Sequence, residues 1–273
     1  MLENSLTARS IRGNTYHLQK ELGYGSYSVV FRGTETKDIT HEPCALKFPK
    51  RETPPRLRIT LIEEEATFCK TFNHPNFIRY IDHCVEPRDP YLVIEIVSET
   101  IAKRIHQKTI TPLLIEQFLT QIPTISQELT TQERIHADLR CTNIAYKNNR
   151  FIVLDPLPQI SRRKPECKNP PRDYAPEFIR SGILTPAADI FSLGKTLEYM
   201  LLQSWKDTPN QSERKKEIEQ NTTITKPLKQ LILSMTEHEP TLRPTPSQLH
   251  TLCQTTLHAL GAQEYITSKI VSA

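Results

Sequence analysis

The sequence predicts an α+β fold in which a β-rich first part is followed by a mainly helical second part. Between Tyr16 and Val97, short runs rich in β-branched and aromatic residues indicate strands, with one helical stretch among them. After Val97, apolar residues recur every three to four positions, which is typical of amphipathic helices. We therefore expect the chain to divide into residues 1–97 and 98–273.

In the first part, one helix is predicted over residues 60–72. The positions there that share helical spacing are Leu61, Glu65, Phe68 and Phe72. The expected strands are Ser28–Gly33, Cys44–Phe48, Phe77–Ile81 and Tyr91–Val97.

In the second part, apolar residues from Leu114 to Leu129 predict a long helix that contains Pro123, which should kink it. Two short apolar runs, Asn143–Tyr146 and Phe151–Leu154, flank a polar turn and predict a pair of strands. Further helices are expected over Ala187–Leu202, Lys226–Met235 and Pro246–Leu260.

Composition excludes several classes of protein. With 37% hydrophobic and 24% charged residues, the 273-residue chain is expected to be globular, and it has no apolar stretch of the roughly 20 residues that a membrane span needs. The first sixteen residues have no apolar core of the signal-peptide kind, which predicts a cytoplasmic protein. The net charge of +4 is spread along the chain, so we expect no nucleic-acid partner. The six cysteines form no C-x-x-C pair and are expected to be reduced.

A glycine-containing turn precedes a lysine in an apolar strand. Gly23 and Gly25, followed by the small Ser28, would let backbone N–H groups approach phosphate oxygens, although a short hairpin would have the same pattern. Lys47 is expected to be buried, and a buried ammonium needs an anionic partner. A phosphate together with a carboxylate would provide the negative charge that the Lys47 ammonium needs. Glu65 on the predicted helix is a candidate, and its neighbours 63 and 64 are alternatives.

The segment His136–Asn143 carries the strongest chemical signal. Asp138 and Asn143, five residues apart on a polar loop, can place a carboxylate on a hydroxyl and an amide oxygen on Mg²⁺. Asp155 ends the next apolar run and is suited to hold a metal that bridges phosphates. Arg140 can steady the charge of a transferring phosphoryl group. Each residue alone would be ordinary in a loop, but the combination indicates phosphoryl transfer.

These segments resemble the eukaryotic-type serine/threonine protein kinase family, in order from about Tyr16 to about Leu249. The resemblance implies a bilobal fold, with 1–97 as the β-rich N-lobe that contains one helix and 98–273 as the mainly helical C-lobe. The further segments that carry it are Tyr91–Val97, Tyr174–Glu177, Asp189–Gly194 and Leu242–Pro244.

The resemblance also implies roles for single residues. Asp138 would be the catalytic base, Asn143 and Asp155 the Mg²⁺ ligands, and Lys47 with Glu65 the ion pair that anchors ATP. Ile94 would be the gatekeeper. The implied nucleotide contacts are Gly23, Gly25, Ser28, Val30, Ala45, Lys47, Ile94, Glu95 and Val97, with Glu95 and Val97 acting through their backbone. A structural pair is implied between Glu177 and Arg243.

The chain departs from the family pattern at three places. Asp155-Pro156-Leu157 stands where the family has D-F-G, and because Pro156 fixes φ we expect Asp155 to be held in one state. Ala137 replaces the arginine of H-R-D, which predicts activity that does not depend on loop phosphorylation. The segment 155–177 contains five basic residues, which indicate either a preference for acidic substrates or a solvated basic loop.

We therefore expect an ATP-dependent protein kinase that acts on Ser or Thr hydroxyls, with ATP and Mg²⁺ as cofactors and a protein as its substrate. Arg140, at the position of the family's lysine, favours Ser/Thr over Tyr by resemblance. One alternative is a pseudokinase that binds nucleotide as a scaffold, because of the changes at Ala137 and Pro156. Another is a small-molecule phosphotransferase, whose catalytic loop has a similar pattern but which generally lacks the motifs at 174–177, 189–194 and 243.

Overall fold

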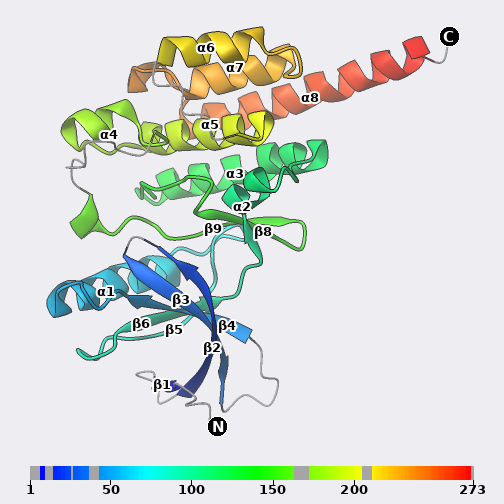
Figure 1. Cartoon of the computed structure of the whole chain (residues 1–273). Helices are drawn as coiled ribbons and strands as arrows, with labels where there is room; N and C mark the ends of the chain where they lie inside the picture. Colours follow the sequence, from blue (N-terminus) through cyan, green and yellow to red (C-terminus); the bar gives the residue numbers. More distant parts are fainter. Residues whose placement is uncertain are drawn as a thin grey trace. The chain divides into compact units, whose positions relative to one another are not determined.

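The computed structural model describes residues 7–9, 15–25, 27–36, 43–162, 172–204 and 211–271. The chain forms two compact units, one made of Met1–Ser98 with Leu154–Ser161 and the other of Glu99–Val153 with Arg162–Ala273. The first unit holds a large β-sheet and the second holds most of the helices (Figure 1). The expected α+β class, with a β-rich and a mainly helical part, is confirmed.

The first unit is built on one antiparallel sheet of six strands in the order β1-β2-β3-β4-β6-β5. Its elements in chain order are β1 (Thr7–Arg9), β2 (Thr15–Tyr24), β3 (Ser28–Glu35), β4 (Pro43–Pro49), α1 (Pro55–Thr71), β5 (Tyr80–Cys84), β6 (Tyr91–Glu95) and the 3₁₀ helix η1 (Gln159–Ser161).

The register of this sheet brings together side chains that lie far apart in the sequence. Val30 lies opposite Lys47, and Ala45 lies opposite Ile94. Because side chains alternate along a strand and directly paired residues point to the same side, these four side chains share one face. The opposite face contributes to a buried core cluster of Tyr16, Cys44, Leu46, Cys84, Tyr91 and Val93.

Helix α1 presents one stripe of its surface to the interior. Its buried residues are Leu61, Ile62, Glu65, Ala66 and Cys69. These positions recur at intervals of three and four residues and therefore lie on one face of the helix. Proline at the first helical position suits the start of α1, because its missing N–H would have no partner there.

The second unit combines helices with a three-stranded antiparallel sheet in the order β7-β8-β9. Its elements are β7 (Glu99–Thr100), α2 (Ile101–His106), α3 (Pro112–Thr131), β8 (Ile144–Lys147), β9 (Arg150–Val153), α4 (Pro176–Ser181), α5 (Pro186–Leu202), α6 (Gln211–Gln220), α7 (Lys226–Met235), the 3₁₀ helix η2 (Pro240–Leu242) and α8 (Pro246–Val271).

Helix α5 is the centre of this unit. It contacts α2, α3, α7 and α8, and every residue from Ala188 to Met200 is buried. Gly194 permits the close approach of α7, because a Cβ at this position would lie 2.7 Å from the Cβ of Met235. Helix α5 therefore places its polar side chains, including Asp189, inside the unit.

Several sequence-based boundaries are wrong. The strand expected at Phe77–Ile81 lies instead at Tyr80–Cys84, because Phe77 packs its ring on Phe72, 5.0 Å away between centroids, next to the end of α1. The helix expected from residue 60 begins at Pro55. The sequence analysis also missed the ten-residue strand β2 and the short elements β1, β7, α2, α4 and α6.

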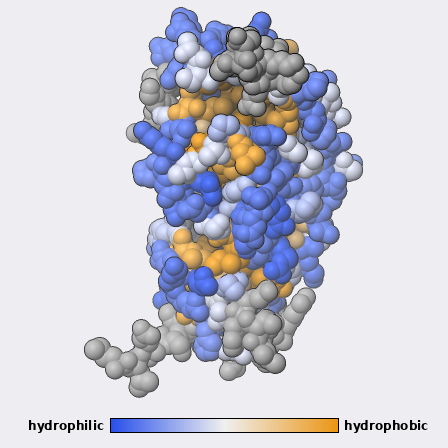
Figure 2. Space-filling model, turned by 90° about the vertical axis from the view of Figure 1, so that its right-hand side faces the viewer, coloured by the Kyte–Doolittle hydropathy of each residue, from blue (hydrophilic) through white to orange (hydrophobic). Residues whose placement is uncertain are grey.

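The surface drawn in Figure 2 is mostly hydrophilic, with hydrophobic residues gathered in separate patches. Within the described ranges, none of the helices has the length and apolar character that crossing a bilayer requires. The cysteines at 44, 69, 84, 141 and 253 are free and buried, whereas the one at 167 lies outside the described residues.

Candidate active site

In the first unit, Lys47 on β4 lies between two carboxylates. Its Nζ is 2.8 Å from both oxygens of Glu65 on α1 and 3.0 Å from Oδ1 of Asp155. Burial by itself would lower the pKa of the Lys47 ammonium, but Asp155 and Glu65 outweigh it and raise the pKa, so the ammonium stays charged. Burial raises the pKa of Glu65 to about 7 despite the opposing charge of Lys47.

Only one of the three consecutive glutamates on α1 faces Lys47. Glu65 lies on the buried stripe of the helix, whereas Glu63 is exposed. Glu64 is half-buried, and its Oε2 accepts a hydrogen bond of 3.3 Å from the backbone N–H of Ile160. The periodicity of the helix thus selects Glu65 among the alternatives that the sequence left open.

The glycine-containing turn joins β2 to β3. Gly25 donates its N–H to the backbone oxygen of Ser28 at 2.8 Å, and Lys50 donates its N–H to the oxygen of Tyr27 at 2.9 Å. The side chains of Tyr24 and Tyr27 are exposed, and Nζ of Lys50 lies 3.8 Å from the centre of the Tyr24 ring. A Cβ on Gly23 would meet no atom within 4 Å, so the turn keeps open space at that position.

The strand β6 and the residues after it contain the predicted adenine contacts. Ile94 is buried on the same sheet face as Ala45 and Lys47. The N–H of Glu95 donates to the oxygen of Arg79 at 3.0 Å, which restricts the expected adenine contact of Glu95 to its carbonyl oxygen. Val97 follows the end of β6 and is half-buried.

Asp155 has a left-handed backbone, with φ of 53°. Its side chain is 41% exposed, so it combines an ion pair to Lys47 with access to solvent. The rigid Pro156 follows it directly, and η1 begins three residues later. A left-handed conformation costs a non-glycine residue roughly 1–2 kcal/mol, although aspartate adopts it more readily than most residues.

In the second unit, the catalytic-loop candidates lie together. The amide nitrogen of Asn143 donates to Oδ2 of Asp138 at 2.6 Å and to the Asp138 backbone oxygen at 3.1 Å. Nε of Arg140 is 2.9 Å from Oδ1 of Asp138. Asn143 thus donates to one carboxylate oxygen of Asp138 and Arg140 forms an ion pair with the other, and together they orient the carboxylate.

Asp189 of α5 anchors the start of the catalytic loop. Its two carboxylate oxygens accept 2.8 Å hydrogen bonds from the backbone N–H groups of His136 and Ala137. Ala137 has a left-handed φ of 69°, and the N–H of Asp138 donates to Nδ1 of His136 at 3.2 Å. The sequence analysis cited Asp189 only as part of a motif and missed this contact, although a buried aspartate inside an apolar helix was a signal for it.

In the basic run after Asp155, Arg162 makes a specific contact. Nη2 of Arg162 donates to the backbone oxygen of Ile135 at 2.6 Å, just before the catalytic loop. Arg172 is exposed, and residues 163, 164 and 168 lie outside the described part of the chain. Neither sequence-based interpretation of the run anticipated the Arg162 contact.

The implied pair between Glu177 and Arg243 is present. The guanidinium nitrogens Nη1 and Nη2 of Arg243 lie 2.7 and 2.8 Å from the two carboxylate oxygens of Glu177, and both residues are buried. Arg243 also donates to the backbone oxygen of Ala187, which joins α4 to the start of α5. The bidentate geometry indicates a structural role.

The donor groups of this chain fit Mg²⁺. Asp155 in the first unit supplies an accessible carboxylate, and Asn143 in the second unit has an amide oxygen beside the amide nitrogen that donates to Asp138. Among the described residues no three His, Cys, Asp or Glu side chains form a metal cluster. Each of Asp155 and Asn143 alone carries an oxygen of the kind that Mg²⁺ binds, because Mg²⁺ commonly takes one or two protein oxygens and completes its shell with water and phosphate.

Comparison with known proteins identifies the class to which this chain belongs. The family model of the protein kinase domain matches residues 16–255, so the chain is a member of the protein kinase family. It is 27% identical over 184 residues to tyrosine-protein kinase Fer of Mus musculus, covering 63% of this chain and 22% of that protein.

Relatives that are not named as tyrosine kinases match as well. The SNF1-like protein kinase ssp2 of Schizosaccharomyces pombe is 27% identical over 197 residues, which are 68% of this chain and 34% of that protein. The probable serine/threonine-protein kinase YbdM of Bacillus subtilis is 22% identical over 201 residues, which are 72% of this chain and 73% of that protein. The chain thus spans between about a fifth and three quarters of the length of these relatives.

Proposed function

We propose that this chain is an active protein kinase that transfers the γ-phosphoryl group of ATP to a hydroxyl of a protein substrate. The observation that carries the proposal is the oriented Asp138 carboxylate, held by Asn143 at 2.6 Å and beside Arg140 at 2.9 Å. The charged Lys47–Glu65 pair supports it, because an ammonium fixed by a carboxylate can also hold phosphate oxygens.

Each residue has a part in the proposed reaction. Asp138 orients the attacking hydroxyl and accepts its proton, while Lys47 binds the α- and β-phosphates of ATP. Asn143 and Asp155 would hold Mg²⁺, which supplies neutralisation of the phosphate charge when it is bound. Most of the acceleration comes from positioning and from charge neutralisation.

For the acceptor, we propose Ser or Thr rather than Tyr. The support is the guanidinium of Arg140 beside the Asp138 carboxylate, a position at which the family's serine/threonine members carry a lysine. The relatives include kinases of both kinds, so phosphotyrosine is the competing outcome.

Two other functions are weaker. A nucleotide-binding scaffold is favoured by Ala137 and Pro156, but Lys47 and Glu65 form the ion pair that a working site requires. A small-molecule phosphotransferase is disfavoured by the buried Glu177–Arg243 pair, which belongs to the segments of protein-kinase type.

The test uses purified protein with Mg²⁺, γ-labelled ATP and a generic protein substrate, followed by phosphoamino-acid analysis. Phosphoserine or phosphothreonine supports the proposal in full. Phosphotyrosine alone would support protein kinase activity but would show that the acceptor is Tyr rather than Ser or Thr. Transfer only to small amines or sugars would indicate the phosphotransferase, and binding of ATP without transfer would indicate the scaffold.

A further inference from the structure

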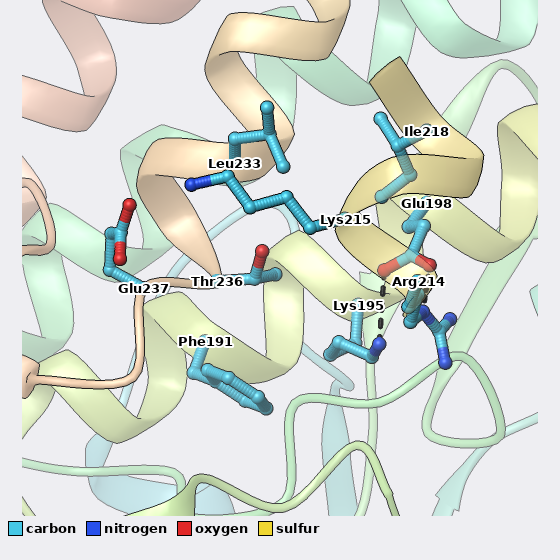
Figure 3. Close-up of a pocket in the computed structure, with 9 residues that line it drawn as sticks. All are labelled: Phe191, Lys195, Glu198, Arg214, Lys215, Ile218, Leu233, Thr236 and Glu237. Atoms are coloured by element: carbon cyan, nitrogen blue, oxygen red, sulfur yellow. Dashed lines mark hydrogen bonds and ion pairs between the residues drawn. The ribbon is translucent and has the colours of Figure 1, made fainter. Parts of the chain in front are cut away.

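A pocket in the second unit lies among α5, α6 and α7 and contains charges that the proposed phosphoryl transfer does not use (Figure 3). It offers about 60 Å³ of room for water-sized molecules. Its charged lining consists of Lys195 and Glu198 from α5, Arg214 and Lys215 from α6, and Glu237, which follows α7. The sequence analysis had assigned no function to any of these residues.

Two of the cations share a single carboxylate. Nζ of Lys195 lies 3.0 Å from Oε2 of Glu198, and Nε of Arg214 donates to the other oxygen, Oε1. All three side chains are buried, with exposed fractions of 5% for Lys195, 1% for Glu198 and 7% for Arg214. A buried charge without a full complement of partners is costly, so a buried group of two cations and one anion favours the entry of a further anion.

The lining holds three cations, Lys195, Arg214 and Lys215, against two carboxylates, Glu198 and Glu237, so one positive charge is left over. Asp173 acts electrostatically on Lys195 and Arg214, but it does not line the pocket and it also acts on Arg140. Burial lowers the pKa of Lys195 to about 8, with Glu198 opposing the change and Arg214 adding to it. An anion beside Lys195 would favour its charged form.

Apart from Thr236, the rest of the pocket is apolar. Phe191, Ile218 and Leu233 line it together with the charged groups. In Figure 3 the exposed Lys215 side chain extends from α6 across the pocket toward Leu233. A ligand that fits this lining has an anionic group, which contacts the cations, and an apolar body, which contacts the apolar side chains.

We propose that this pocket binds a small organic anion, with its phosphate or carboxylate group beside Lys195, Arg214 and Lys215 and its apolar body against Phe191 and Ile218. The proposal concerns a site separate from the catalytic-loop residues, and it stands whether or not the chain transfers phosphoryl groups. Phosphate and carboxylate share the chemistry that recognises them, which is ion pairing with lysine and arginine.

The test is methyl NMR of the full chain with labelled isoleucine. Phenyl phosphate is titrated in, and the methyl group of Ile218 reports on the pocket while that of Ile94 reports on the predicted nucleotide-binding face. We expect a saturable shift of Ile218 that persists when an ATP analogue has already saturated the nucleotide site. Inorganic phosphate, which lacks the apolar body, and phenol, which lacks the charge, should each bind at least about fivefold more weakly.

Three variants complete the test. Lys195→Met should weaken phenyl phosphate about tenfold or more, and Lys215→Met should weaken it severalfold. Lys215 is exposed, so its variant reports on the pocket even if the buried Lys195→Met fails to fold. Lys216→Met, an exposed neighbour that does not line the pocket, should leave the affinity unchanged. An unmoved Ile218, or equal affinity in all three variants, would overturn the proposal.

Discussion

Asp189 on α5 accepts the backbone N–H of Ala137 at 2.8 Å and so holds Ala137 at a left-handed φ of 69°. A non-glycine residue in this conformation costs roughly 1–2 kcal/mol, so the catalytic loop depends on a partner that opposes the strain. Asp189 provides it with a second bond to His136. The position of Asp138 therefore depends on the buried carboxylate of Asp189, which binds the two residues that precede Asp138 in the loop.

Asp189→Asn should lower kcat about tenfold or more. The amide keeps one acceptor but turns its NH₂ toward a backbone N–H, so one of the two bonds is lost and the loop relaxes. The Kd for ATP should stay unchanged, and stability should fall by about 1–3 kcal/mol. Asp89→Asn, an exposed change, is the control. A normal kcat in Asp189→Asn would show that the loop is held in another way.

The activity should decline as the pH falls below about 7. Burial raises the pKa of Glu65 to about 7, so acid protonates Glu65 and releases the Lys47 ammonium that it fixes. We expect the KM for ATP to rise below this pH in the parent chain. In Glu65→Gln the KM should be high at every pH, whereas Glu63→Gln, exposed on the same helix, should behave as the parent. A KM that is constant between pH 6 and 8 would contradict this role of Glu65.

Activity should not require phosphorylation of the segment after Asp155. Ala137 removes the usual cation of the catalytic loop, and Arg162 instead contacts the backbone oxygen of Ile135 at 2.6 Å. Phosphatase treatment should change kcat less than about twofold, whereas Arg162→Met should lower it severalfold by removing a charged hydrogen bond. The exposed Arg172→Met serves as the control. A large loss after phosphatase treatment would refute the prediction.

The buried Lys195 should make stability depend on pH in the alkaline range. Its folded-state pKa of about 8 lies below the ordinary value of 10.5, so the unfolded chain binds more protons between these values. The unfolding free energy of the parent should therefore rise relative to that of Lys195→Met as the pH increases from 8 to 10.5. The relative gain over the window is on the order of 3 kcal/mol. Denaturant unfolding of both proteins at several pH values measures it, and parallel curves would contradict it.

The sequence predicted the elements whose signals are local and periodic. Helix α3 and helix α5 follow from apolar spacing, and the strands β8 and β9 follow from two apolar runs around a turn. Helices α2 and α4 span six residues each, too few to show a clear repeat, and the ten residues of α6 are almost all polar. The strand β5 was misplaced because the apolar run before it continues the packing around Phe72.

The residues of the candidate site divide in the same way, into those with a local sequence signal and those that depend on tertiary contacts. Residue types at fixed spacing predicted Asp138, Asn143 and Asp155 as candidates, and the burial stripe of α1 was needed to choose Glu65 among its neighbours. The contacts of Asp189 with His136 join residues 53 positions apart, and no local pattern reports such a bond. Arg214 lies in a polar segment to which the sequence analysis assigned no role, and tertiary packing buries this residue beside Glu198.

The most direct test of the account is phosphoryl transfer by Asp138→Asn, measured together with its affinity for ATP. Asparagine keeps the shape of the side chain but cannot accept the proton of the attacking hydroxyl. We predict that the variant binds ATP within about threefold of the parent and loses transfer by about a hundredfold or more. Transfer at the parental rate in Asp138→Asn, or none in the parent with Mg²⁺ and ATP, would contradict the proposal that this chain is a protein kinase.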